Sequence, residues 1–505
     1  MSGVLLGRIH YAPYHPDPPI NSFLRYLPSL FLQALDPDIA EDEWNDLRKN
    51  GVDAESIGAY REKVEALMLK HCDLFQLYPD KNGFYQHHNV VADKKLKTDL
   101  DAMLIHFICG NNPVHSHVNG SLQQICLPCA LLALMHHDNF CLAGTLGHSN
   151  FRGQTCYLCM IHESDIFKRM VLNTWFRSAN ENDEPGNNGW ESPSGEGDNP
   201  TWVEIGREVK NGFEDNSEDV GIRRAVLYTP RHAFFDVEHE EGQCDLCGQV
   251  SNTLVRRYYW ERYGNKLNSQ GVTVRHPTQA VYMDSKNGFL PVNYNPSVWR
   301  NLGVLVLKNY ESINKKNNAI QFKAAPIVTQ FVSITEESVP FTLELMAFEA
   351  NQAKLFDFHH DRITLPPFTD DDEMEQFYQR METFALAVVS MLNAFRSYGT
   401  KDKKRQKVQI AAINDRHAEF TQRFGRKILD GITRFREIFD PDEENELFSR
   451  MKEMLKSYKN EMLNDFENLC QNEYSWDNIK AQEKLIKQKS GLAGTLSRII
   501  NDFYE

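Results

Sequence analysis

Apolar residues recur at helical spacing along the whole C-terminal part of the chain, and this pattern constrains the fold more than any other feature. It begins after the segment TLPPFTDDD at 364–372, whose two prolines interrupt regular structure. The first stripe repeats at intervals of four and three residues and consists of Phe377, Met381, Phe384, Val388, Met391 and Phe395. Similar stripes run through 413–439, 447–469 and 479–503. Because each stripe occupies one helix face, residues 369–505 are predicted to form a C-terminal four-helix bundle.

Residues 1–366 show no single period and are predicted to form a large mixed α/β domain, so the fold class is α+β. Two helical segments are expected within 21–75. Short β-rich runs separated by turn residues follow in 223–350, among them RAVLYTP, QAVYMD and NLGVLVLK. The stretch 178–200 holds six acids and no base among Gly, Pro, Asn and Ser, which indicates an acidic surface insertion.

The charge of the chain is unevenly distributed. The 505 residues carry a formal net charge of −15, yet residues 401–436 hold eleven bases and four acids. A local excess of positive charge can bind a polyanion, although charge alone favours the simpler interpretation of a solvated helix face. No apolar run approaches the ~18 residues that a membrane helix needs, and the N-terminus lacks the pattern of a secretion signal. A cytoplasmic protein without a membrane partner is therefore predicted.

Six of the ten cysteines lie in three Cys-x-x-Cys pairs. A Cys-x-x-Cys turn presents two thiolates to one ion, and two such pairs can close a tetrahedral Zn²⁺ site that stabilises structure. The predicted ligands are Cys126, Cys129, Cys244 and Cys247, although 114 residues separate the two pairs. The pair Cys156 and Cys159 competes for this role, and buried thiols without a metal are the alternative.

The sequence contains no convincing active site. It lacks the phosphate-binding G-x-x-x-x-G-K-[ST], the dinucleotide-binding G-x-G-x-x-G and the nucleophile elbow G-x-S-x-G. The triplet HHD occurs at 136–138 and 359–361, but the further His and Asp that an HD-type metallohydrolase requires have no clear position. Two stretches are unusual as loops: 142–154 is rich in glycine, and 348–363 carries the amides Asn351 and Gln352.

Taken in order, these features resemble the large, CasA-type subunit of the type I-E CRISPR Cascade complex. The resemblance extends over roughly residues 20–505. The matching segments are DLFQLYPDKNGFYQ at 73–86, ICLPC at 125–129, the glycine loop ending in FRGQ at 151–154, PTW at 200–202, LYTPRHAFF at 227–235, QCDLCGQ at 243–249 and NQAKLFDFHHDRI at 351–363. The chain departs from the family at its start, MSGVLLGRIHYAPY, which lacks the usual Leu-Ile-Asp…Pro-Trp strand.

The resemblance implies a non-catalytic subunit that recognises the PAM in double-stranded DNA and nucleates the R-loop. The implied partners are the other Cascade subunits, the CRISPR RNA, target DNA and a helicase-nuclease that docks on this chain. By position in the family's motifs, a glutamine wedge, a lysine finger and a glycine loop contact the DNA, and they correspond to Gln352 with Asn351, to Lys286, and to Ala143, Gly144, Thr145, Gly147 and Arg152. The bundle would bind the phosphates of the displaced DNA strand through Lys401, Lys403, Lys404, Arg405 and Lys407.

Two other classes of function stay open. One is a metal-dependent HD-like nuclease that acts through His359, His360 and Asp361. The other is an assembly scaffold whose loops never touch bases.

Overall fold

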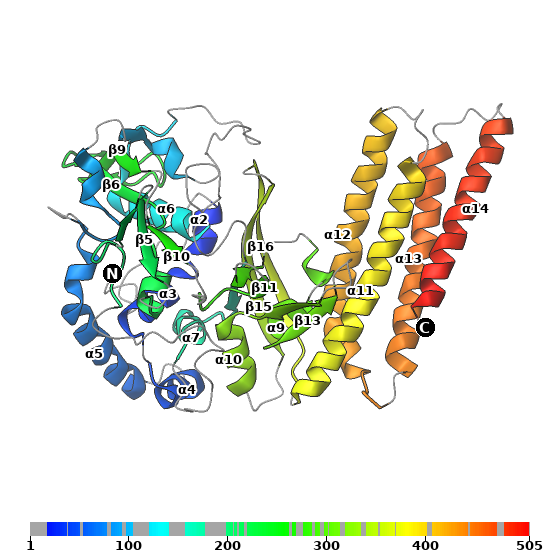
Figure 1. The fold of residues 1–505 in the computed structure, drawn as a ribbon, viewed down its shortest axis with the longest axis horizontal. Coiled ribbons are helices and arrows are strands. Elements are labelled where there is room, and N and C mark those ends of the chain that lie inside the picture. Colours follow the sequence, from blue (N-terminus) through cyan, green and yellow to red (C-terminus); the bar gives the residue numbers. More distant parts are fainter. Residues whose placement is uncertain are drawn as a thin grey trace. The chain divides into compact units, whose positions relative to one another are not determined.

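The structure is a computed structural model of the chain (Figure 1). It describes residues 18–37, 39–50, 54–77, 82–92, 97–104, 121–140, 157–176, 198–205, 207–209, 212–216, 220–261, 265–268, 276–284, 288–292, 297–300, 302–313, 319–334, 340–351, 354–368, 370–400, 407–442, 445–471 and 479–503. These residues belong to two compact units. Unit 1 comprises the described residues within 1–294, 308–334 and 342–362. Unit 2 comprises those within 295–307, 335–341 and 363–505. Both helices and separate sheets occur, which confirms the predicted α+β class.

Short helices and small sheets make up unit 1. Its described helices are α2 (Pro18–Phe23), α3 (Leu27–Leu35), α4 (Glu41–Asn50), α5 (Ala54–Lys70), α6 (Leu127–Asn139), α7 (Ile166–Leu172), α8 (Ile222–Val226) and α10 (Pro326–Ile334). Single 3₁₀ turns are η1 (Cys72–Phe75), η2 (His88–Ala92) and η4 (Leu100–Met103). In place of the two helical segments expected within 21–75, four helices form, and Pro28 lies in the first turn of the second of them.

Most of the described strands pair antiparallel in small sheets. One sheet has β9 (Leu254–Glu261) at its centre, paired with β1 (Lys97–Asp99), β2 (Ile125–Cys126) and β6 (His232–Glu238). A second has the order β10 (Asn265–Asn268), β5 (Gly212–Asn216), β4 (Arg207–Val209), and its β10–β5 pair is parallel. A third has the order β12 (Gly288–Pro291), β11 (Val281–Asp284), β14 (Ala319–Lys323), β13 (Tyr310–Ile313). The last two are β16 (Lys354–Leu365), β15 (Phe341–Asn351), β3 (Leu158–Ile161), and the pair β7 (Gly242–Gln243) and β8 (Val250–Ser251).

Long helices dominate unit 2. After η8 (Val298–Arg300) and α9 (Leu302–Val306) come α11 (Asp371–Thr400), α12 (Lys407–Glu437), α13 (Asn445–Gln471) and α14 (Ile479–Asp502), and these four pack against one another (Figure 1). Asp370 caps α11, because its carboxylate accepts hydrogen bonds from the backbone N–H groups of Asp372 and Glu373. All six residues of the stripe on α11 are buried. In the core between helices, the Phe424 and Tyr458 rings stack with centroids 4.0 Å apart.

Two of the predicted β-rich runs are helices. RAVLYTP overlaps α8, and NLGVLVLK contains α9. Both runs are short and buried, and a short apolar run has no period that separates a strand from a buried helix. Tertiary contacts decide the outcome for α8, where the Asp198 carboxylate accepts the backbone N–H groups of Arg223 and Arg224 in the first turn.

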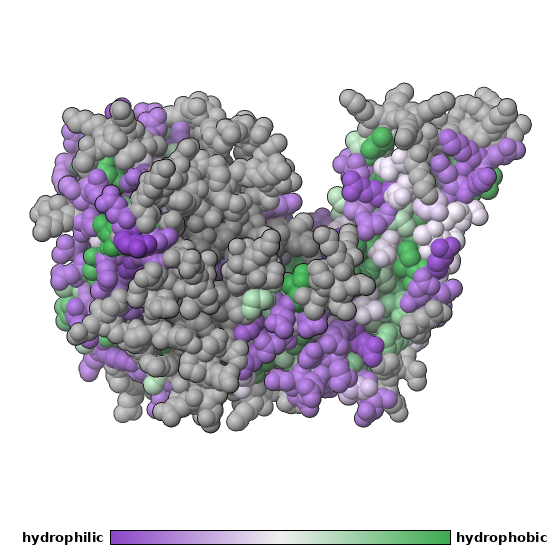
Figure 2. Space-filling view, in the orientation of Figure 1, coloured by the Kyte–Doolittle hydropathy of each residue, from purple (hydrophilic) through white to green (hydrophobic). Residues whose placement is uncertain are grey.

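The segment 348–363, interpreted from sequence as a loop, is mostly two long strands. The paired strands β15 and β16 form a hairpin in which only residues 352–353, outside the described ranges, separate Asn351 from Lys354. On the face drawn in Figure 2, hydrophilic side chains make up much of the described surface, with smaller apolar areas among them. Within the described ranges, no helix is long and apolar enough to cross a membrane.

Candidate metal centre and nucleic-acid interface

The first cysteine pair lies where a strand turns into a helix. Strand β2 ends at Cys126, which pairs with Leu254 of β9, and α6 begins at the next residue. Pro128 stands in the first helical turn, where the missing N–H of a proline costs nothing. This arrangement places Cys129 one turn after Cys126, with both side chains buried.

The second pair lies in the tight turn between β7 and β8. The Cys244 N–H donates to the Gln249 carbonyl at 2.8 Å, and the Gly248 N–H donates to the Cys244 carbonyl at 2.8 Å. Gly248 has a φ of +74°, a backbone conformation that a residue with a Cβ rarely adopts. The turn holds Cys247 so that its N–H points at the Cys244 sulfur, 3.5 Å away.

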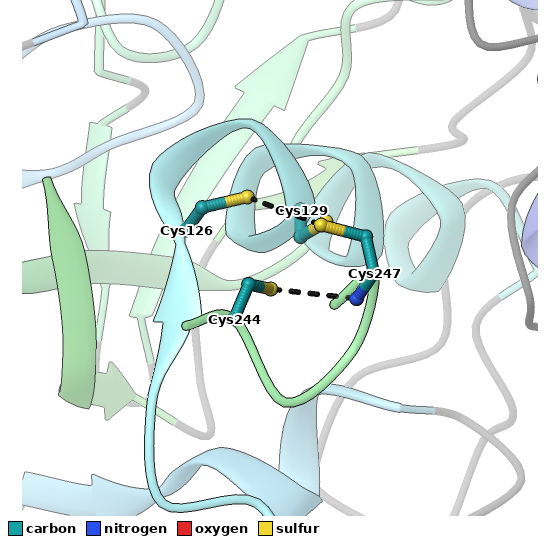
Figure 3. Close-up of side chains that lie close together, drawn as sticks. All are labelled: Cys126, Cys129, Cys244 and Cys247. Carbon is teal, nitrogen blue, oxygen red and sulfur yellow. Dashed lines mark hydrogen bonds between the residues drawn. The ribbon is translucent and has the colours of Figure 1, made fainter. Parts of the chain in front are cut away.

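Hydrogen bonds from the backbone and side chain of Asp245 join the two turns across 114 residues of sequence. The Asp245 carboxylate accepts the N–H groups of Gln123 and Gln124, at 2.7 and 2.9 Å. In return, the Asp245 N–H donates to the Gln124 carbonyl at 2.9 Å. Because Gln124 is two residues before Cys126 and Asp245 follows Cys244, these bonds hold the two pairs of thiols close together (Figure 3).

The four sulfur atoms fit a single metal ion. They all lie within 4.8 Å of one another, and Cys126 Sγ is 3.9 Å from Cys247 Sγ. Tetrahedral Zn²⁺ with bonds of about 2.3 Å requires sulfur atoms about 3.8 Å apart. Hydrogen bonds from the thiols of Cys126 and Cys129 lower the pKa of Cys244, whereas the pKa of Cys129 is raised by its bonds to Cys126 and Cys244 and by burial. Four cysteines at this spacing can therefore hold a metal ion with no position left open.

The competing pair does not join this cluster. Cys159 lies in β3, fully buried and paired with Leu345 of β15, and it is not among the clustered sulfur atoms. Cys156 lies outside the described residues.

Both HHD triplets serve packing and pairing within unit 1. His136, His137 and Asp138 are buried in α6. On β16, His359 pairs with Glu349 at 3.1 Å, whereas His360 bonds to Glu344 and to Ser22. Successive residues of a strand point to opposite faces, so His359 and His360 cannot converge on one metal ion. Over the described ranges, the four cysteines are the one His/Cys/Asp/Glu cluster close enough to hold a metal.

Most of the side chains expected to contact DNA lie outside the described residues. These are Ala143, Gly144, Thr145, Gly147, Arg152, Lys286, Gln352, Lys401, Lys403, Lys404 and Arg405. Asn351 is the last residue of β15 and Lys407 the first of α12, and only their backbones are described. What the structure does describe is the set of elements that carry these segments.

Two of these segments start from the same packed cluster. Residues 141–156 lie between Phe140, which ends α6, and β3, which pairs with β15. The Phe140 ring contacts Phe348 of β15 and Phe358 of β16, with centroids 5.5 and 6.1 Å apart. Phe348 is three residues from Asn351, the end of β15, a span of about 10 Å along the strand. The described residue before the glycine-rich segment and the described strands of the hairpin therefore meet in one cluster.

The basic stretch of unit 2 is partly neutralised by its neighbours. On α12, Arg423 and Lys427 both pair with Glu461 of α13, at 2.8 and 3.1 Å, and Arg416 pairs with Asp465 at 2.9 Å. Arg436 pairs with Glu373 of α11 at 2.8 Å. These pairings, which composition alone does not reveal, neutralise four of the basic side chains in the described part of the stretch.

Comparison with known proteins gives consistent matches. The family described as CRISPR-associated protein Cse1 matches residues 16–461. The crystal structure of Thermobifida fusca Cse1 aligns with a TM-score of 0.65 at 14% identity, covering 98% of this chain and 94% of that chain. A CRISPR-associated protein from Thermus thermophilus aligns with a TM-score of 0.61 at 15% identity, covering 96% and 92%. A chain of a CRISPR RNA-guided surveillance complex aligns with a TM-score of 0.61 at 11% identity, covering 97% and 94%.

Proposed function

The chain belongs to the CRISPR-associated Cse1 family, and on this premise we propose that it is the large, CasA-type subunit of a CRISPR RNA-guided surveillance complex. Family membership confirms the resemblance inferred from the ordered motifs. Its partners are then the other subunits of that complex and the CRISPR RNA. Its own role is to recognise DNA rather than to catalyse a reaction.

The specific role we propose is recognition of the PAM in duplex DNA and nucleation of the R-loop. The observation that carries this proposal is the shared anchor of the two expected DNA-contacting segments at Phe140, Phe348 and Phe358. A wedge must push against a base step without yielding, and a rigid hairpin provides that resistance. Inserting Gln352 beside the PAM costs a few kcal/mol, which the growing RNA–DNA heteroduplex offsets. Lys286, between β11 and β12, would enter the minor groove, whose degenerate pattern permits several PAMs.

We further propose that the four cysteines bind a structural Zn²⁺. The sulfur spacing, the burial of three of the four side chains and the lack of an open position support this role. The ion would fix the start of α6, the helix that ends at Phe140.

In unit 2, residues 401–407 remain the candidates for a phosphate track along the displaced strand, because Arg416, Arg423 and Lys427 further along α12 already pair with acids. Neutralising Lys401, Lys403, Lys404 and Arg405 together should weaken binding of target DNA and lower its salt dependence. If the dependence of DNA affinity on salt concentration is unchanged, residues 401–407 do not bind the displaced strand through its phosphates. A helicase-nuclease docks on this subunit in our proposal, and co-elution with the DNA-bound complex tests that contact.

The experiment that tests the central proposal is duplex binding by the guide-RNA complex, reconstituted with and without this chain. Matched targets differ only in the base pairs that flank the protospacer. We expect the chain to make binding depend on those base pairs. We also expect Gln352→Ala to slow opening of duplex targets while leaving binding of pre-opened targets unchanged.

Gln379→Ala is the matched control, because Gln379 is an exposed glutamine on α11 of the other unit. It should behave as the wild type in both assays. Binding that ignores the flanking base pairs, with a chain that still assembles, would contradict PAM recognition and favour the scaffold function. Metal-dependent DNA cleavage by the isolated chain, lost in His360→Ala, would favour the nuclease.

A further inference from the structure

Near the base of the β15–β16 hairpin, one buried carboxylate gathers four basic side chains. Glu344 of β15 has no exposed surface. Its Oε1 lies 2.8 Å from Arg25 Nε and 3.5 Å from Arg362 Nη2, and its Oε2 lies 3.1 Å from His162 Nδ1. His360 Nε2 also bonds to Oε1. We call these five residues the Glu344 cluster.

The four basic residues come from three separate segments of unit 1. His360 and Arg362 lie on β16, His162 directly follows β3, and Arg25 lies in the turn between α2 and α3. Ser22 of α2 adds a second bond from the same segment as Arg25, since its Oγ is 3.0 Å from His360 Nδ1. The cluster therefore joins both strands of the hairpin to β3 and to the α2–α3 segment.

A buried charge that is bonded to several partners holds those partners in place, because it needs all of them. An ionised carboxylate is stable away from water only when hydrogen bonds and opposite charges surround it. Each partner that moves away leaves that charge less compensated, so the cluster resists any shift of the hairpin relative to α2 and β3. The basic side chains are 23–45% exposed, whereas the carboxylate is completely enclosed.

The hairpin has a second attachment closer to its tip. Phe23 of α2 contacts Phe140, which contacts Phe348 and Phe358 of the hairpin. Phe348 lies four residues beyond Glu344 on the same face of β15, about 13 Å along the strand. Two attachments at different distances from the tip fix the direction of the hairpin, which one alone would leave free to pivot.

We propose that Glu344 is a positioning residue for the DNA wedge: by holding the base of the hairpin, it sets the direction in which Asn351 and Gln352 meet the duplex. This inference rests on the proposed function of Gln352. Glu344 does not touch DNA, and its effect is carried by the hairpin. The segment HHDR at 359–362 has no part in the DNA contacts proposed above. It contributes His360 and Arg362, two of the four basic partners of Glu344.

A double-mutant cycle in the full reconstituted complex tests the proposal. The chains are the wild type, Glu344→Gln, Gln352→Ala and the double variant, with duplex opening followed by a fluorescent base analogue beside the PAM. Glu349→Gln is the matched control, because Glu349 lies on the opposite face of β15 and pairs with His359. Binding of a target with a pre-opened bubble is measured for every chain.

We expect Glu344→Gln to slow duplex opening at least about fivefold, with binding of the bubble target unchanged and Glu349→Gln equal to the wild type. In the Gln352→Ala background, Glu344→Gln should add no further slowing, because its effect passes through the tip. A variant that merely loosens the fold would slow both backgrounds equally. If Glu344→Gln fails to assemble, Arg25→Gln, which removes a partly exposed partner, replaces it in the same cycle.

The outcomes separate the two proposals. If Gln352→Ala slows opening and Glu344→Gln does not, the positioning role is wrong and the wedge stands. Independent, multiplicative effects of the two substitutions overturn the positioning role as well. If Gln352→Ala opens the duplex at the wild-type rate, the proposed function of the tip fails whatever Glu344 does.

Discussion

The Glu344 cluster makes a quantitative prediction about acid stability. Burial alone raises the pKa of Glu344, but the hydrogen bond from His360 and the charge of Arg25 outweigh it and lower the pKa from 4.5 to about 2. A carboxylate whose pKa is lower in the folded than in the unfolded protein stabilises the fold at a pH above the unfolded-state pKa. That stability is lost as the pH falls from about 4.5 to about 2. At about 1.4 kcal/mol per pKa unit, the ionised side chain contributes about 3 kcal/mol.

Glu344→Gln keeps the size of the side chain and removes its titration. Urea unfolding of wild type and variant is compared at pH 5 and pH 3, a range below the ordinary titration of histidine. We expect the wild type to be the more stable chain at pH 5, and this difference to shrink by about 2 kcal/mol at pH 3. Glu349→Gln is the control, and its effect on stability should be small at both pH values because Glu349 is part-exposed. A stability difference between wild type and Glu344→Gln that stays constant with pH would refute the reasoning.

Two further predictions concern the metal centre and unit 2. In native mass spectrometry we expect one bound zinc in the wild type and none in Cys129→Ser, with a lower melting temperature, whereas Cys72→Ser, at an exposed cysteine outside the cluster, should match the wild type in both. Gly425→Ala should destabilise the protein by about 1–3 kcal/mol in thermal unfolding, because its Cβ would lie 2.2 Å from Trp299 Nε1. Gly494→Ala meets no atom within 4 Å and should be neutral or slightly stabilising; equal losses for the two glycines would contradict the packing argument.

The sequence indicated which cysteines could form a cluster better than it indicated what brings them together. Each Cys-x-x-Cys pair is a local pattern, so residue spacing picked out the candidate pairs but left Cys156 and Cys159 in competition with the two that cluster. The contact between the pairs depends on the register of β2 against β9 and on the bonds between Gln124 and Asp245. No local pattern encodes such a pairing across 114 residues.

The Glu344 cluster could not have been found from periodicity. In a strand with one buried face, the alternation of Leu343, Glu344 and Leu345 predicts that Glu344 points to water. In the structure Leu343, Glu344 and Leu345 are all buried, because both faces of β15 are covered. The feature of the sequence that pointed to this cluster is the segment HHDR at 359–362, in which the alternate residues His360 and Arg362 lie on one face of β16. Without knowledge that β15 brings Glu344 beside them, that segment resembles a metal-binding sequence.

Helix α6 explains how a metal ion remote from DNA could matter for recognition. Cys126 and Cys129 stand at its start, and Phe140 follows its last residue. Thirteen helical residues span about 20 Å, so an ion at the cysteines is too far from the hairpin to act on it directly. It would act by fixing the start of a rigid helix whose other end packs against Phe348 and Phe358. The segment 141–156 leaves from that same end, so both expected DNA contacts depend on where α6 lies. Metal loss should therefore impair duplex opening by displacing the anchor of the wedge.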